Sequence, residues 1–159
     1  MKKIVASVFL TCILLFTLSQ LNAFAEDSTR WRLPEGAKAR LGKGSIKQIA
    51  YSPNGMHLAA AGSAGIWIYD VTIHQEVALL TENTGPVSGI AFSPDGSTIV
   101  SGYSSADILV WDAETGEHLK TLKGHTGGVS SVAFSPDGKV LASGRTDGTI
   151  LLWDFSTPP

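Results

Sequence analysis

Short apolar runs alternate with polar, turn-forming segments over most of the chain. The runs are rich in Val, Ile, Leu, Phe and Trp, whereas Pro, Gly, Asn and Asp gather between them, which is typical of β-strands joined by tight turns. Some runs are apolar on both faces, such as Ile150-Leu151-Leu152-Trp153, so their sheets must be covered on two sides. In the middle of the chain the pattern predicts four strands, at 87–92, 98–101, 107–112 and 117–122. No helix is predicted, and the expected fold class is all-β.

The same four-residue turn occurs three times. It reads Ser-Pro-Asn-Gly from Ser52, then Ser-Pro-Asp-Gly from Ser93 and from Ser135, at offsets of 41 and 42 residues. A second marker recurs at offsets of 42 and 42, as Tyr69-Asp70, Trp111-Asp112 and Trp153-Asp154. Two markers that keep one period indicate three copies of one structural unit.

The third copy carries the fullest pattern. Leu122-Lys123-Gly124-His125 is followed by Val129–Gly138 (VSSVAFSPDG) and Leu141–Asp154 (LASGRTDGTILLWD), and this succession resembles a WD repeat. The similarity covers about residues 41–154. It implies a WD-repeat β-propeller of three four-stranded blades, in a family made up mainly of scaffolds and recognition modules. The blades are expected at about 45–81, 86–123 and 128–154. Closed propellers have about four to eight blades, so these three form an incomplete ring.

The resemblance also assigns a structural role to four residues of the third repeat. In the family, a His, a Ser, an Asp and a Trp form a hydrogen-bonded set that ties neighbouring strands together, and here they are His125, Ser143, Asp147 and Trp153. We expect the Ser143 hydroxyl to link the imidazole and the indole N–H, and the Asp147 carboxylate to orient His125. A His–Ser–Asp trio also resembles a catalytic triad, but that alternative places the nucleophile between strands without an oxyanion site and leaves Trp153 unexplained.

The set decays in the other two repeats. The second has Glu82-Asn83 in place of Gly-His and Ser105 in place of the Asp, and the first has Leu41-Gly42 in place of Gly-His and Tyr69 in place of the Trp. A site repeated for chemistry is not expected to decay in this way, whereas a stabilising device is, because packing supplies the rest of the stability. The other histidines are far apart along the chain, without the spacing of metal ligands. We therefore predict no catalytic residues, no metal site, no cofactor and no enzymatic activity.

A partner-binding face is implied by the same resemblance. Propellers usually bind partners where the first strand of each blade begins, at positions that flank its first apolar residue. Here those positions are Ser45, Lys47, Pro86, Ser88, Gly128 and Ser130. They are small and mostly neutral, so they predict a face for a protein or peptide without naming it. The alternative, that they are solvent-facing loop residues without a role, remains open.

The first 25 residues predict export. Lys2 and Lys3 precede a largely apolar run, and Ala23-Phe24-Ala25 provides the small residues of a signal-peptidase site. The expected product is a bacterial-type exported protein, periplasmic or secreted, with residues 26–36 as a polar linker. The alternative, a retained membrane anchor, needs about 20 apolar residues, and this run is shorter.

Charge and cysteine content exclude several classes of function. The net charge is −2, and removal of Lys2 and Lys3 with the leader leaves 10 basic and 14 acidic side chains, or −4. No basic cluster is visible, which argues against binding to nucleic acid or, after cleavage, to a membrane. The only cysteine, Cys12, lies in the leader, so the mature part has no disulfide, no thiolate metal site and no thiol nucleophile.

Closure of the ring needs material beyond the three repeats. The pattern predicts eleven strands after Ile46 and one candidate closing strand before it, at 37–41, while the third repeat has no fourth strand. Either further blades or another copy must complete the ring, and the ending 156–159, which has no capping element, favours a larger propeller. The predicted function is an exported scaffold that binds a protein or peptide. The alternative is the non-catalytic propeller of a larger exported enzyme.

Overall fold

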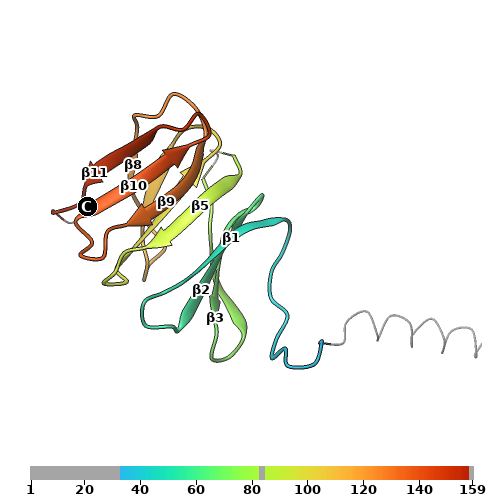
Figure 1. Cartoon of the computed structure of the whole chain (residues 1–159). Coiled ribbons are helices and arrows are strands. Elements are labelled where there is room, and N and C mark those ends of the chain that lie inside the picture. The colour runs from blue at the N-terminus through green and yellow to red at the C-terminus, as the bar shows by residue number, and fades with distance from the viewer. Residues whose placement is uncertain (1–32, 83–84, 158–159) are drawn as a thin grey trace, which may run out of the picture. The chain divides into compact units, whose positions relative to one another are not determined.

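The structure, a computed structural model, describes residues 33–82 and 85–157 (Figure 1). The predicted signal peptide, 1–25, and residues 26–32 of the predicted linker lie outside the described residues. The chain divides into two compact units, Met1–Arg40 and Leu41–Pro159. In the first unit the amide of Ala37 donates to the carbonyl of Pro34 over 3.0 Å, which closes a turn. The described strands all belong to the second unit.

Eleven strands are found among the described residues, and they form three antiparallel sheets without any helix. The first sheet has the order β1-β2-β3-β4, the second β5-β6-β7-β8 and the third β11-β10-β9. The strands are β1 Ile46–Tyr51, β2 His57–Gly62, β3 Gly65–Asp70, β4 Gln75–Leu80, β5 Val87–Phe92, β6 Thr98–Tyr103, β7 Ile108–Asp112, β8 His118–Leu122, β9 Val129–Phe134, β10 Val140–Arg145 and β11 Ile150–Asp154. The predicted all-β fold class is confirmed, and the strand predicted at 87–92 coincides with β5.

The repeated four-residue turn joins the first two strands of each sheet. In the second sheet, the Ser93 hydroxyl donates to Asp95 and accepts from the Thr98 amide over 3.0 Å, while Gly96 has a φ of 78°. Glycine adopts this left-handed conformation without strain. The hydrogen bond from Ser93 lowers the pKa of the Asp95 carboxyl. The same bonds recur at Ser52 and Ser135, which explains why the turn sequence repeats.

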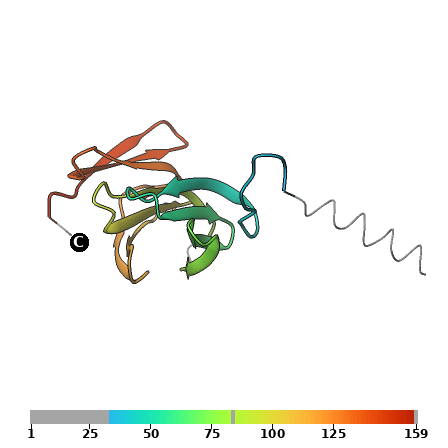
Figure 2. The same cartoon turned by 90° about the horizontal axis from the view of Figure 1, so that it is seen from below.

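The sheets pack face to face in sequence order, and their first strands are neighbours: β1 contacts β5, and β5 contacts β9 (Figure 1, Figure 2). Two apolar cores result. One lies between the first and second sheets and includes Ile66, Ile68, Ile90 and Leu109. The other lies between the second and third sheets. It includes Val100, Ile108, Val110, Val129, Val132 and Leu141. The second sheet, whose strands are apolar on both faces, is therefore covered on both sides. In the third sheet the run Ile150-Leu151-Leu152-Trp153, for which cover on two sides was predicted, has Ile150 and Leu152 exposed.

The contact between β1 and β5 and the contact between β5 and β9 differ at one equivalent position of the repeats. Four residues before the turn serine, β1 has Gln48 and β5 has Gly89. The Gln48 amide donates to the Ile90 carbonyl over 3.2 Å and accepts from the Ile90 amide over 3.1 Å, so it bridges β1 and β5. A Cβ on Gly89 would lie 3.0 Å from the Cα of Ser131, so the missing side chain lets β5 approach the backbone of β9.

The third sheet has three described strands and so lacks a counterpart of β4 and β8. This agrees with the eleven strands expected after Ile46. Residues 37–41, the candidate closing strand, form no strand in this structure, and their pairing with another sheet stays a prediction. Within the described ranges, no helix has the length and apolarity to cross a membrane.

Candidate partner-binding face

Four of the six predicted face residues line one hollow. Lys47 lies on β1, Ser88 on β5, Gly128 just before β9, and Ser130 on β9, and they come together where these three strands begin. Pro86 lines a neighbouring depression, between the first and second sheets. Ser45 is exposed and is close in sequence to Lys47, but it is not among the residues that line the hollow. Lys47 and Ser130 are exposed, so both side chains are open to a partner.

Besides Val129, at the start of β9, two polar lining residues were not predicted from the sequence: Ser104, in the loop between β6 and β7, and Thr146, in the loop between β10 and β11. Both stand eleven positions after the turn serine of their repeat, and Ser63 holds the same position in the first. The recurrence of a hydroxyl at one position of all three repeats is a pattern from which these lining residues could have been predicted. Ser63 lines the neighbouring depression together with Pro86.

The polar groups that line the hollow are mainly hydroxyl groups, together with the ammonium group of Lys47. The hydroxyls of Ser88 and Ser104 lie 3.2 Å apart, and the Ser130 hydroxyl donates to the Gly144 carbonyl over 3.1 Å. Hydroxyls of this kind both donate and accept, which suits the backbone amides and carbonyls of a peptide. The ammonium of Lys47 adds a positive charge at the β1 side of the hollow.

The structure brings three of the four predicted set residues into direct contact. Trp153 donates its indole N–H to the Ser143 hydroxyl over 2.7 Å, and Nε2 of His125 lies 2.6 Å from the same oxygen. Because Ser143 accepts from the indole, its own proton is available to a neutral His125. The Asp147 carboxylate contacts other residues: it accepts from Thr149 and pairs with Arg145 over 2.9 Å. Its expected role in orienting His125 is therefore not seen as a hydrogen bond.

Comparisons with known proteins fit this geometry. Residues 116–154 match the family described as "WD domain, G-beta repeat". The blades have the WD40 β-propeller fold. Residues 56–127 match a second family, described as "Vps8 beta-propeller". A search of curated proteins gives no significant match.

Solved structures agree with the fold. The chain is similar to the structure titled "Crystal structure of RRP9 WD40 repeats", at 26% identity and a TM-score of 0.67, and to "Structure of U3-55K", at 26% identity and a TM-score of 0.68. Each match covers 72% of this chain and 37% of the solved chain. The chain therefore spans little more than a third of the length of these WD40 proteins.

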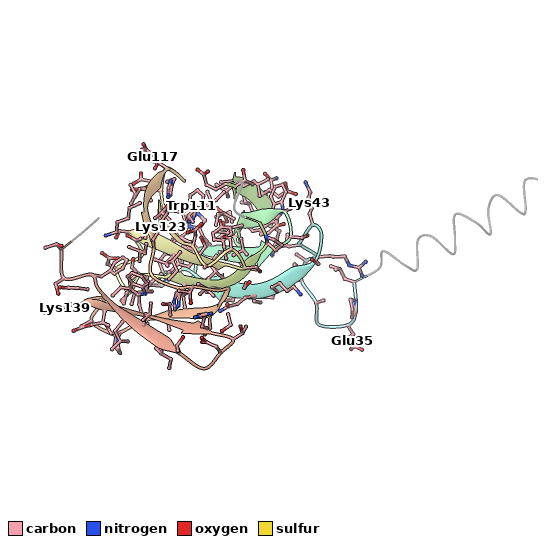
Figure 3. All side chains as sticks on the ribbon, turned by 90° about the horizontal axis from the view of Figure 1, so that it is seen from above. Glu35, Lys43, Trp111, Glu117, Lys123 and Lys139 are labelled. Atoms are coloured by element: carbon pink, nitrogen blue, oxygen red, sulfur yellow. The ribbon has the colours of Figure 1, made fainter. Side chains whose placement is uncertain are left out.

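The hydrogen-bonded serine and tryptophan recur in the second WD40 blade. Trp111, which is buried between the first and second blades, donates its indole N–H to Ser101 over 2.8 Å (Figure 3). In the first blade the position of the serine holds Ala60 and that of the tryptophan holds Tyr69. The serine acceptor has thus been replaced together with the tryptophan of this pair, while the buried indole N–H of Trp67, on β3 of the same blade, has no hydrogen-bond partner among the residues that the structure describes.

Among the described residues, no group of three or more His, Cys, Asp or Glu side chains is placed to hold a metal ion. Ser143 is completely buried, and its oxygen already contacts both His125 and Trp153. A buried hydroxyl in this position is unsuited to attack a substrate. The triad interpretation therefore gains no support from the geometry.

The stability of the third blade is expected to fall as the pH is lowered below about 6.5. Burial lowers the pKa of His125, the nearby Arg145 lowers it further, and Asp147 opposes them. The unfolded chain then takes up a proton on His125 before the folded chain does, so protons favour unfolding. Urea unfolding at pH 7 and at about pH 5 measures the loss of stability. Both pH values lie above the range in which carboxyl groups with lowered pKa values titrate, so these groups do not contribute to the difference.

The matched control for this pH effect is His125→Gln, whose side chain does not titrate. Its free energy of unfolding is expected to change less between the two pH values than that of the wild-type chain. An equal change in both proteins would show that His125 is not the group responsible.

Proposed function

We propose that this chain is an exported WD40 module that binds a protein or peptide segment in the hollow lined by Lys47, Ser88, Ser104, Gly128, Ser130 and Thr146. The observation that carries the proposal is the convergence of these residues from three blades around the start of β1, β5 and β9. WD40 propellers are typically protein-interaction scaffolds, and this hollow gives such a scaffold a defined contact surface.

The chemistry of the hollow favours an extended peptide segment that carries a carboxylate. Hydroxyls from the second and third blades offer donors and acceptors to a peptide backbone, while Lys47 faces the same space. A carboxylate placed beside Lys47 gains a charge-assisted hydrogen bond. The proposed activity is binding without catalysis, since the one Ser–His contact of the third blade is occupied by Trp153.

Selection of a random peptide library on the purified chain tests the proposed site. We expect the enriched peptides to contain Asp or Glu and to lose about tenfold in affinity for Lys47→Glu, equivalent to roughly 1.4 kcal/mol. Ser130→Trp, which fills the hollow, is expected to weaken them as well. The control is Lys139→Glu, at the turn between β9 and β10 (Figure 3). Peptides that bind all of these proteins equally would place the site elsewhere.

Export is the second part of the proposal. Its support is the leader sequence, with a positive start, an apolar run and Ala23-Phe24-Ala25 at its end. Mass spectrometry of the protein recovered from outside a bacterial cytoplasm should find Glu26 at its N-terminus. Protein that keeps residues 1–25 in the membrane fraction would contradict export and leave the binding proposal unaffected.

A further inference from the structure

Each blade has two faces, and the contacts inside the chain show what each face binds. We call the face that meets the following blade the trailing face, and the face that meets the preceding blade the leading face. The trailing faces at the two junctions contain Ala59, Ile66 and Ile68 in the first blade and Val100, Ile108 and Val110 in the second. The leading faces contain Val87, Ile90 and Phe92 in the second blade and Val129, Val132 and Phe134 in the third.

The trailing face of the third blade is uncovered in this chain. At the positions of Val100, Ile108 and Val110 it has Ala142, Ile150 and Leu152. Ile150 is 68% exposed and Leu152 is 72% exposed, whereas Ile108 and Val110 are 0% exposed at the same positions of the second blade. The third blade therefore has the apolar side chains of a blade-binding face without a blade on it.

The leading face of the first blade is uncovered in the same way. At the positions of Val87, Ile90 and Phe92 it has Ile46, Ile49 and Tyr51. Ile49 is 55% exposed, and its counterpart Ile90 is 1% exposed. Contiguous apolar side chains of this kind on a surface mark a contact with another protein.

The two uncovered faces complement each other. One is a trailing face and the other a leading face, and a trailing face on a leading face is the contact that the chain already makes twice. The six side chains named on the two faces are uncharged, so their contact buries no unpaired charge. A second copy of the chain thus provides the partner surface for each uncovered face.

We infer that two copies of this chain associate head to tail, with the trailing face of each third blade on the leading face of the other copy's first blade. Two copies supply six blades, within the range of about four to eight found in closed propellers, whereas three copies would supply nine. A head-to-tail contact leaves no uncovered face only when the ring closes, and an open arrangement would continue into a filament.

The edge of the third blade fits this arrangement. β11 is an edge strand, while its counterparts β3 and β7 pair with β4 and β8. An unpaired edge offers a row of amide and carbonyl groups to another strand. The candidate closing strand, 37–41, directly precedes the first blade in the sequence. Pairing of this segment with β11 would give each third blade its fourth strand.

Sedimentation of the purified chain and two charge variants tests the inference. The wild-type chain is expected at twice its chain mass of 16.7 kDa, less any leader removed. Ile49→Lys alters only the leading face and Leu152→Glu only the trailing face, so each variant alone is expected at half the wild-type mass. An equimolar mixture is expected to recover the dimer, because one contact is then native and the other pairs the introduced lysine of one variant with the introduced glutamate of the other.

The control is Ile73→Lys, which places a charge on an exposed apolar residue of the β3–β4 turn, and it is expected to remain dimeric. Circular dichroism checks that each variant keeps its β-structure, and Ile46→Lys with Ile150→Glu serves as the second pair if one does not. A monomeric wild-type chain, a larger open polymer, or a mixture that stays monomeric would each overturn the inference. Recovery of the dimer in the mixture also excludes a contact between two like faces, because only head-to-tail contact predicts that two monomeric variants form a dimer when they are mixed.

Discussion

Ser143→Ala is expected to lower the free energy of unfolding by about 1–3 kcal/mol, the usual range when a buried polar group loses its partner. The hydroxyl is completely buried and serves two side chains at once, the indole of Trp153 and the imidazole of His125. Alanine fills nearly the same space, so the loss arises from the two unpaired nitrogens and not from a cavity. Urea unfolding at one fixed protein concentration measures it, since association of copies would make stability depend on concentration.

The matched control is Ser130→Ala, on the neighbouring strand β9. The Ser130 hydroxyl is exposed and donates to the Gly144 carbonyl, a group that water can reach in its place. We expect Ser130→Ala to cost well under half of the loss at Ser143. Equal losses in the two variants would mean that the hydrogen bonds of Ser143 do not hold the third blade together.

Gly89→Ala is expected to destabilise the junction between the second and third blades by about 1–3 kcal/mol, the cost of forcing extra atoms into packed space. The added Cβ would lie 3.0 Å from the Cα of Ser131 and 3.2 Å from the amide nitrogen of Val132. Both atoms belong to the backbone of β9, so the clash is relieved only by moving the strands apart. Urea unfolding measures the loss, and hydrogen exchange should show it first in β9.

The control for Gly89→Ala is Ser88→Ala, on the same strand. Ser88 is partly exposed at the hollow, and its hydroxyl contacts that of Ser104. Its replacement removes one oxygen and adds nothing toward β9, so we expect a change within about 0.5 kcal/mol, as at most surface positions. A larger loss at Ser88 than at Gly89 would contradict the close approach of β5 and β9.

The strands could be predicted closely because their limits are set by local chemistry. The Ser-Pro-Asp-Gly turn binds its own residues, so Ser93 fixes the end of β5 wherever the blade lies. The apolar runs then fix which residues face the neighbouring blades. The serine–tryptophan contact was implied by the resemblance to WD repeats, and it joins strands that are adjacent in sequence.

Other features of the site could not be predicted, because the sequence alone does not show which of several possible contacts a side chain makes. Asp147 had three candidate partners nearby, and its bonds to Arg145 and Thr149 took the place of the expected one to His125. Ser104 and Thr146 entered the hollow because loops from two blades converge with the first strands. The replacement of the tryptophan by Tyr69 was visible in the sequence, and the strand register adds that the position of its serine partner holds Ala60.

The order of strands within each blade has a consequence for how the chain folds. In all three sheets, every hydrogen-bonded neighbour is the next strand along the chain, so pairing proceeds hairpin by hairpin. Such local contacts close short loops and favour rapid folding, even in an all-β chain. Each blade can therefore form once about 40 residues of its own are available, the spacing of the repeats. The apolar faces of each blade then stay exposed until the blades dock on one another, because only contacts between blades cover them.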